Sequence, residues 1–96
     1  MRVGIAGYGV VGKKRYSSII KNSSFRVTDI SEVNPIARDE IPAGVNVFDN
    51  YQDLILKADL DIIFISLPNK YASDAVSLSL QKGLNVFCEK PPARTL

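Results

Sequence analysis

The sequence has 96 residues, of which 46% are apolar and 23% are charged, and its formal net charge at pH 7 is +2. This length and composition predict one globular domain over residues 1–96 rather than a disordered or multidomain chain. The near balance of 12 basic and 10 acidic residues argues against a nucleic-acid partner.

Missing residue types exclude several kinds of site. Histidine is absent and Cys88 is the one cysteine, which excludes a histidine-dependent catalytic triad within the chain and argues against any metal site. A single cysteine cannot form an internal disulfide and suits a reducing compartment. No apolar run approaches the ~18 residues of a membrane span, and Met1 leads directly into a predicted strand rather than a signal peptide. We expect a cytoplasmic protein without a membrane partner.

The first twelve residues carry the most informative pattern. Val3 to Ala6 predict a short buried strand, and three glycines then follow with G-x-G-x-x-G spacing before a predicted helix. The first glycine permits the tight turn, the second lets a pyrophosphate approach the backbone, and the third lets the helix lie close on the strand. The helix amino terminus would then face the anion. The alternative is a plain glycine-rich turn. The candidate cofactor-binding residues here are Gly7, Tyr8, Gly9, Val10, Val11 and Gly12.

The helix after this turn is predicted to bury an apolar stripe made of Val10, Val11, Tyr16, Ile19 and Ile20. A second strand is predicted over residues 25–32. Glu32 would stand at its carboxyl end, about 20 residues after the glycine motif, where an acid accepts hydrogen bonds from the adenosine ribose. Because a carboxylate would repel a 2′-phosphate, we favour NAD over NADP. The alternative for Glu32 is an ordinary loop carboxylate, and Asp29 is a weaker candidate, interpreted as a solvated or helix-facing acid.

The remaining elements alternate between helices and strands. Asn34 is predicted to cap a short helical turn, and Asp49 or Asn50 to cap the next helix. Strands are predicted over residues 45–48, 61–67 and 84–88, with Cys88 as a small buried residue. The helix between the last two strands would bury one side and end at Gly83 in a left-handed cap. That side contains Ala72, Ala75, Val76, Ser79 and Leu80.

This alternation predicts an α/β fold, namely a Rossmann-type open parallel sheet of order 3-2-1-4-5 with helices on both faces, in three layers. Ligands of such sheets bind beyond the carboxyl ends of the strands, where the strand order reverses. Two further segments are therefore candidate cofactor-binding sites together with the glycine turn and Glu32. They are Ser66, Leu67, Pro68 and Asn69, and Glu89, Lys90 and Pro91.

Three segments together resemble the glucose-fructose oxidoreductase/inositol dehydrogenase (Gfo/Idh/MocA) family. They are Gly-Tyr-Gly-Val-Val-Gly at 7–12, Ser-Leu-Pro-Asn at 66–69 and Glu-Lys-Pro-Pro-Ala at 89–93. The resemblance implies an NAD(P)-dependent oxidoreductase that acts on a sugar, polyol or similar hydroxyl compound. It also implies that Lys90 is catalytic, reaching the nicotinamide and the reacting hydroxyl. An ammonium there would stabilise charge that develops on the oxygen.

The chain departs from the family in three ways, one of which is a short segment between Pro35 and Gly44, where family members usually have a full helix. Ala72 stands where family members often carry a histidine, and Leu96 ends the sequence before the substrate domain of a family member. We therefore expect an amino-terminal domain or fragment that binds cofactor without turnover. The alternative is a regulatory module that senses NAD without chemistry. The fifth strand would be an open sheet edge, which favours a homo-oligomer.

Overall fold

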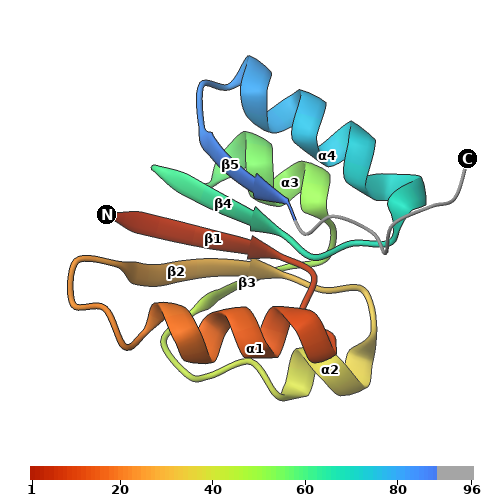
Figure 1. Ribbon diagram of the computed structural model, residues 1–96. Helices are drawn as coiled ribbons and strands as arrows, with labels where there is room; N and C mark the ends of the chain where they lie inside the picture. The colour runs from red at the N-terminus through yellow and green to blue at the C-terminus, as the bar shows by residue number, and fades with distance from the viewer. Residues whose placement is uncertain (89–96) are drawn as a thin grey trace, which may run out of the picture.

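The computed structural model describes residues 1–88, which form a five-stranded sheet between two layers of helices (Figure 1). The strands are β1 (Arg2–Ala6), β2 (Arg26–Ser31), β3 (Asn46–Phe48), β4 (Ile62–Ile65) and β5 (Asn85–Cys88). The helices are α1 (Val10–Ile19), α2 (Pro35–Asp39), α3 (Tyr51–Lys57) and α4 (Asn69–Gln81). All strand pairs are parallel and the order is β3-β2-β1-β4-β5, which confirms the predicted fold class and topology.

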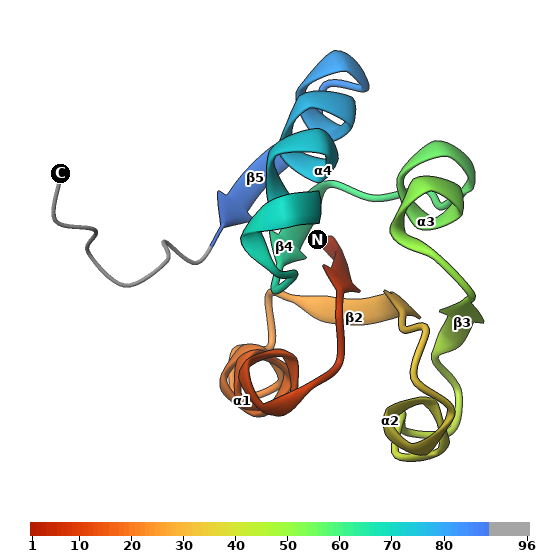
Figure 2. The same ribbon diagram turned by 90° about the vertical axis from the view of Figure 1, so that its right-hand side faces the viewer.

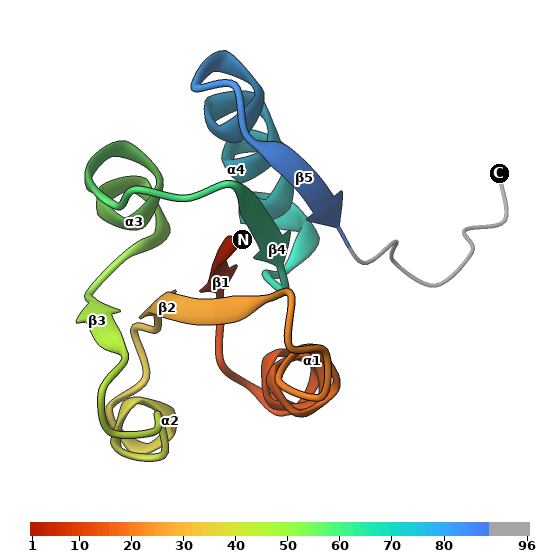
Figure 3. The ribbon, with the colours of Figure 1, turned by 90° about the vertical axis from the view of Figure 1, so that its left-hand side faces the viewer.

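The helices divide between the two faces of the sheet. Figure 2 shows α1 and α2 below the sheet and α3 and α4 above it, and Figure 3 shows the same division from the opposite side. The strand order reverses between β1 and β4, so the two helix layers cover opposite faces on either side of that point. None of the helices in residues 1–88 has the length and apolar character that a membrane span requires.

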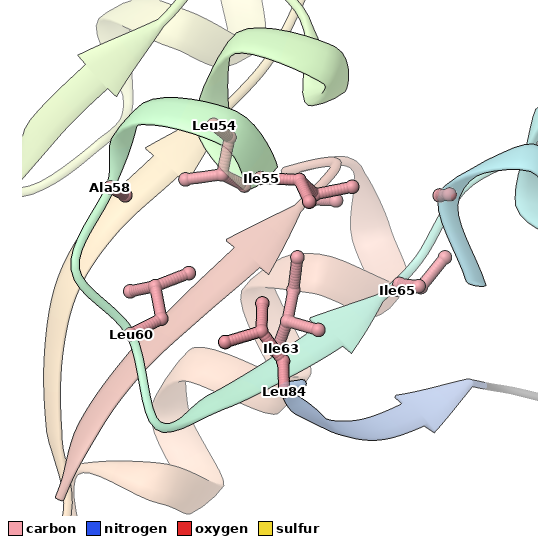
Figure 4. Packing of buried hydrophobic residues seen from close by; sticks show 9 residues of the cluster. Leu54, Ile55, Ala58, Leu60, Ile63, Ile65 and Leu84 are labelled. Atoms are coloured by element: carbon pink, nitrogen blue, oxygen red, sulfur yellow. The ribbon is translucent and has the colours of Figure 1, made fainter. Parts of the chain in front are cut away.

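The larger core lies between the sheet and the helices α3 and α4 (Figure 4). Ile63 and Ile65 of β4 point into it and are at most 1% exposed. Ile62 belongs instead to the core under α1, so β4 is buried on both faces, as its nearly continuous apolar sequence predicts. The other members of the larger core are Ala6, Leu54, Ile55, Ala58, Leu60, Ala75 and Leu84.

The second core lies between the sheet and α1, and here one prediction is wrong. Ile19 is buried, and Tyr16 packs against the cluster. Val10, Val11 and Ile20 are 71%, 42% and 52% exposed, so the predicted apolar stripe is not buried as a whole. The reason is that α1 touches the sheet through Gly12 and Ile19, its buried residues, which turns its first residues outward.

Two asparagines cap helices as predicted. The Asn34 side chain accepts hydrogen bonds from the backbone N–H groups of Ile36 and Ala37 at the start of α2. Asn50, rather than Asp49, caps α3, because its Oδ1 accepts from the Asp53 N–H at 2.8 Å. Each cap satisfies donors that a helix start would otherwise leave unpaired. Gly83 has a φ of 84° and ends α4 in the predicted left-handed conformation.

Two further predictions about burial are wrong, and one of two alternatives for a third residue is excluded. Leu80 is 61% exposed, because α4 turns Ala75 and Ser79 toward the core and leaves position 80 beyond that face. Cys88 is exposed, because it ends β5, an edge strand that pairs only with β4 among the described residues. Asp29 is only 3% exposed and accepts hydrogen bonds from the Thr28 hydroxyl and from the Asn46 amide, so of its two alternatives the solvated acid is excluded.

Lys82 joins the carboxyl ends of α3 and α4. It is the carboxyl-terminal cap residue of α4, and its ammonium donates to the carbonyls of Ile55, Leu56 and Ala58 at 2.7, 2.8 and 3.1 Å. The last carbonyls of a helix lack intrahelical partners and carry the negative end of its dipole, so a cation placed there stabilises them.

Replacing this ammonium should therefore lower stability. We expect Lys82→Met to lower the free energy of unfolding by about 1–2 kcal/mol, because three acceptors lose a charged donor. Urea denaturation followed by circular dichroism measures the change. Lys57→Met is the matched control in the last turn of α3, where the side chain is 68% exposed and 3.8 Å from Asp53. We expect the control to lose under about 0.5 kcal/mol; equal losses would show that charge alone, rather than direct bonding, is responsible.

Candidate functional site

The glycine turn brings α1 into contact with the end of β1. A Cβ atom on Gly12 would lie 2.0 Å from the backbone oxygen of Gly7, so no side chain fits there. Gly7 has a φ of +98°, and its Cβ would lie 2.5 Å from the Ser66 backbone oxygen. Its N–H donates to the Ser31 carbonyl at 2.9 Å. The turn is therefore held at once by the ends of β1, β2 and β4.

Gly9 differs from the other two glycines of the motif. A Cβ atom there would have no atom within 4 Å, so nothing in residues 1–88 requires a glycine at this position for packing. Gly9 is the amino-terminal cap residue of α1, no side chain of the described residues caps that helix, and its first turn contains no acidic residue. The first N–H groups of α1 thus lack a side-chain acceptor. Open space before an uncapped helix terminus fits an anion such as a pyrophosphate.

Glu32 contacts the glycine turn directly. Its Oε1 accepts from the Tyr8 N–H at 2.6 Å, and its Oε2 accepts from the Asn34 N–H at 2.9 Å. Its own N–H donates to the Phe48 carbonyl of β3 at 3.1 Å. The carboxylate is consequently fixed between the turn after β1 and the start of α2, and it is only partly exposed.

These residues surround a pocket of about 580 Å³ at the carboxyl end of the sheet. Its size falls within the range of small-molecule sites, about 300–1,000 Å³. Six of the predicted site residues line it, namely Gly7, Gly9, Glu32, Ser66, Leu67 and Pro68. Seven lining residues were missed by the sequence analysis, namely Ser31, Val33, Asn34, Asn50, Tyr51, Gln52 and Tyr71. Most of the missed residues directly follow β2 or β3, and the topology places those strand ends on the same edge of the sheet.

The other predicted site residues lie outside the pocket lining or outside the described chain. Tyr8 contributes its backbone N–H to Glu32, while its side chain is 4% exposed and packs under α1, where burial raises its pKa above the usual value. Val10, Val11 and Gly12 belong to the first turn of α1, and Asn69 is the first residue of α4. Glu89, Lys90 and Pro91 lie outside the described residues.

The pocket has the chemistry that a dinucleotide needs. It combines a glycine turn with room for phosphate, a fixed carboxylate able to accept hydroxyl hydrogen bonds, and apolar walls made by Val33, Leu67 and Pro68. Because all these groups come from residues next to the strand ends, the position is the one expected of ligands of doubly wound sheets.

Comparison with known proteins identifies the family to which the chain belongs. Residues 1–96 match the Gfo/Idh/MocA family model described as oxidoreductase family, NAD-binding Rossmann fold. The chain is 31% identical over 100 residues to an inositol 2-dehydrogenase/D-chiro-inositol 3-dehydrogenase of Shouchella clausii, a match that covers 99% of this chain and 29% of that protein. It is 29% identical to a D-xylose 1-dehydrogenase (NADP(+)) of Haloferax volcanii, over 95% of this chain and 29% of that protein.

The chain is also similar to a solved protein structure. The crystal structure of scyllo-inositol dehydrogenase from Lactobacillus casei, with bound NAD(H) and scyllo-inositol, matches with a TM-score of 0.86 and 30% identity, over 95% of this chain and 28% of that one. The chain thus spans less than a third of the length of these relatives. The match to the family model covers every residue, and it confirms the resemblance inferred from the three motifs: the chain belongs to the Gfo/Idh/MocA oxidoreductase family, as an NAD-binding Rossmann domain.

Proposed function

We propose that the pocket binds NAD, with the pyrophosphate against the glycine turn and the adenosine ribose on Glu32. The observation that carries this proposal is the hydrogen bond from Tyr8 N–H to Glu32 Oε1, which holds the Glu32 carboxylate beside the glycine turn. The uncapped amino terminus of α1 and the open space at Gly9 support the same placement. The cofactor-binding role extends to Val10, Val11, Gly12, Asn69, Glu89, Lys90 and Pro91 as the sequence motifs imply.

The charges around the pocket favour NAD over NADP. Glu32 is the one charged residue among those that line the pocket within residues 1–88, and no lysine or arginine is among them. Val33, the next residue, is 74% exposed and offers no cation. A 2′-phosphate would meet a carboxylate without a compensating positive charge, which costs binding free energy.

In a longer protein, we propose that this domain serves hydride transfer between the nicotinamide and a sugar or polyol hydroxyl. The nicotinamide ring supplies the hydride acceptor or donor when the cofactor is bound. Lys90 would stabilise negative charge on the substrate oxygen through its ammonium group. Substrate contacts and the general base would come from a region like the one that the longer relatives have beyond the length matched here.

Removing the Glu32 carboxylate should abolish the cofactor preference. We expect Glu32→Ala to weaken NADH binding about tenfold or more, because charge-assisted hydrogen bonds contribute roughly 1.5–3 kcal/mol each. NADPH should lose less, so the two affinities converge. Isothermal titration calorimetry of the chain with each nucleotide measures this. Asp39→Ala is the control, since it removes an exposed carboxylate from α2; an NADH preference that survives in Glu32→Ala would contradict the assignment.

Substitutions at two of the three glycines should distinguish an effect on cofactor binding from an effect on folding. Gly9→Ala should lower stability much less than Gly12→Ala, because its Cβ meets no atom and only the weaker capping by alanine costs stability, yet it should weaken NADH binding by blocking the phosphate approach. Gly12→Ala should lower the free energy of unfolding by about 2–3 kcal/mol, because its Cβ collides with the Gly7 carbonyl. Differential scanning fluorimetry and calorimetric titration together test both. Undiminished NADH affinity in a folded Gly9→Ala variant would argue against a phosphate at this turn.

A test of the role of Lys90 requires a protein that catalyses the reaction. We expect Lys90→Ala to lower kcat about a hundredfold or more in a chimera that joins this chain to the remainder of a curated relative, because an electrostatic contact to the reacting oxygen is lost. Steady-state kinetics on inositol and on sugars measures the effect, with Lys21→Ala, which truncates an exposed lysine after α1, as the control. Turnover that persists in Lys90→Ala would favour a domain that binds NAD without using this lysine in chemistry.

A further inference from the structure

Asp29 is a buried acid that the site described above does not use. It lies within β2, is 3% exposed, and belongs to none of the ion pairs among residues 1–88. Its two side-chain oxygens instead accept hydrogen bonds from the Thr28 hydroxyl and from the Asn46 amide, the latter at 3.1 Å. Burying a carboxyl group costs free energy unless such donors satisfy it. These two contacts therefore show which parts of the fold the acid holds together.

Thr28 is the extra residue of a β-bulge in β2. Val27 pairs with Val3 of β1, whereas Asp29 pairs with the residue directly after Val3. Thr28 therefore has no partner on β1, and such an extra residue shifts the alternation of side chains between the two faces by one position. Val27 and Ile30 accordingly both pack in the core under α1, although residues three apart face opposite sides of a regular strand. The bulge thus decides which face each later residue of β2 takes.

The shifted alternation directs Glu32 toward the glycine turn. Glu32 lies directly after β2, and its N–H continues the pairing with β3 by donating to the Phe48 carbonyl at 3.1 Å. Because it follows Ile30 by two residues, it lies by alternation on the side of α1, and there its Oε1 accepts from the Tyr8 N–H. A strand without the extra residue would turn this position to the opposite face of the sheet.

Asn46 ties the bulge to the edge of the sheet. β3 is the outermost strand on this side, is three residues long and contains no buried residue (Figure 3). Asn46 and Asp29 are direct neighbours in the pairing of β2 with β3, and their side-chain hydrogen bond fastens β3 at its first residue. The Phe48 carbonyl that accepts from the Glu32 N–H lies two residues further along the same strand. Asp29 thus restrains Glu32 twice, through the bulge in β2 and through the register of β3.

We propose that Asp29 is a positioning residue for Glu32 in cofactor recognition, an inference that rests on the proposed function. Asp29 does not line the pocket, so it acts through the orientation of Glu32. A carboxylate held in one orientation loses little freedom when ribose hydroxyls bind to it, whereas a released one must be ordered again. NADPH carries a phosphate in place of the 2′-hydroxyl that Glu32 would accept, so this ordering matters for NADH in particular. The preference for NADH therefore depends on Asp29.

Substitutions on both sides of the side-chain bond test this proposal. Asn46 is exposed, so Asn46→Val removes the donor without opening a cavity in a core. We expect this variant and Asp29→Ala to bind NADH about fivefold more weakly in calorimetric titration, the effect of one hydrogen bond of ordinary strength, while NADPH affinity stays nearly the same. Asp29→Asn keeps an oxygen for the Thr28 hydroxyl and places an amide against the Asn46 side chain, whose own oxygen can accept it. This conservative variant should therefore retain the affinity of the unsubstituted chain.

Asn85→Val is the matched control at the other edge of the sheet. Asn85 is the exposed first residue of β5, and its amide donates to the Asp61 carbonyl at 3.2 Å. This variant loses a hydrogen bond of the same kind on the edge strand opposite β3, and it should keep both the NADH affinity and the preference over NADPH. A loss as large as that of Asn46→Val would overturn the proposal, because the effect would then reflect general stability. Unchanged NADH affinity in both folded test variants would overturn it as well.

An NMR measurement without ligand separates this inference from the function on which it rests. The Tyr8 and Asn34 N–H groups donate to the Glu32 carboxylate at 2.6 and 2.9 Å, so their proton resonances report on its orientation. The two test variants should move both resonances upfield, as expected of weaker hydrogen bonds, and the control should leave them in place. Unmoved resonances in the folded test variants would overturn the positioning role even where nucleotide binds. If the unsubstituted chain binds neither nucleotide, the proposed function fails, whereas the resonances alone still decide whether Asp29 orients Glu32.

Discussion

The close approach of Gly12 to the Gly7 carbonyl is the constraint on which the site depends. Because neither glycine leaves room for a Cβ atom, α1 begins directly against the end of β1. The same contact leaves the amino terminus of α1 at the edge where β1, β2 and β4 end. The hydrogen bond from Gly7 N–H to Ser31 and that from Tyr8 N–H to Glu32 both require this position of the turn.

The sequence predicts strand burial, helix caps and strand order, because these features depend on a short stretch of chain or on the order of the elements. The apolar run of β4 predicts its burial on both faces, Asn34 predicts a helix cap, and the alternation of elements predicts the strand order. Topology then places Glu32 and the segment after β4 at one edge, so six of the site residues could be named in advance. These predictions succeed because each depends on a short stretch of chain or on a general rule of connection.

Predictions that depend on the neighbours of a residue in space are less successful. The exposure of Val10 and Val11 follows from the angle at which α1 meets the sheet, and the exposure of Cys88 follows from the lack of a described strand beyond β5. Tyr51 and Tyr71 meet because α3 and α4 pack side by side (Figure 1). No spacing in the sequence encodes that meeting, although the position of Tyr51 just after a strand end is a signal of proximity to the pocket.

The contacts between α3 and α4 have a consequence for stability. Lys82 joins the carboxyl ends of the two helices, and the bond from Tyr51 to Asp74 joins the start of α3 to the first half of α4. These two sets of hydrogen bonds fix α3 and α4 relative to each other near both ends. Glu32 and the glycine turn, fastened to each other, belong to the opposite half of the sheet. Residues from both groups line the pocket, so a molecule that binds there contacts both and favours the folded chain over the unfolded one.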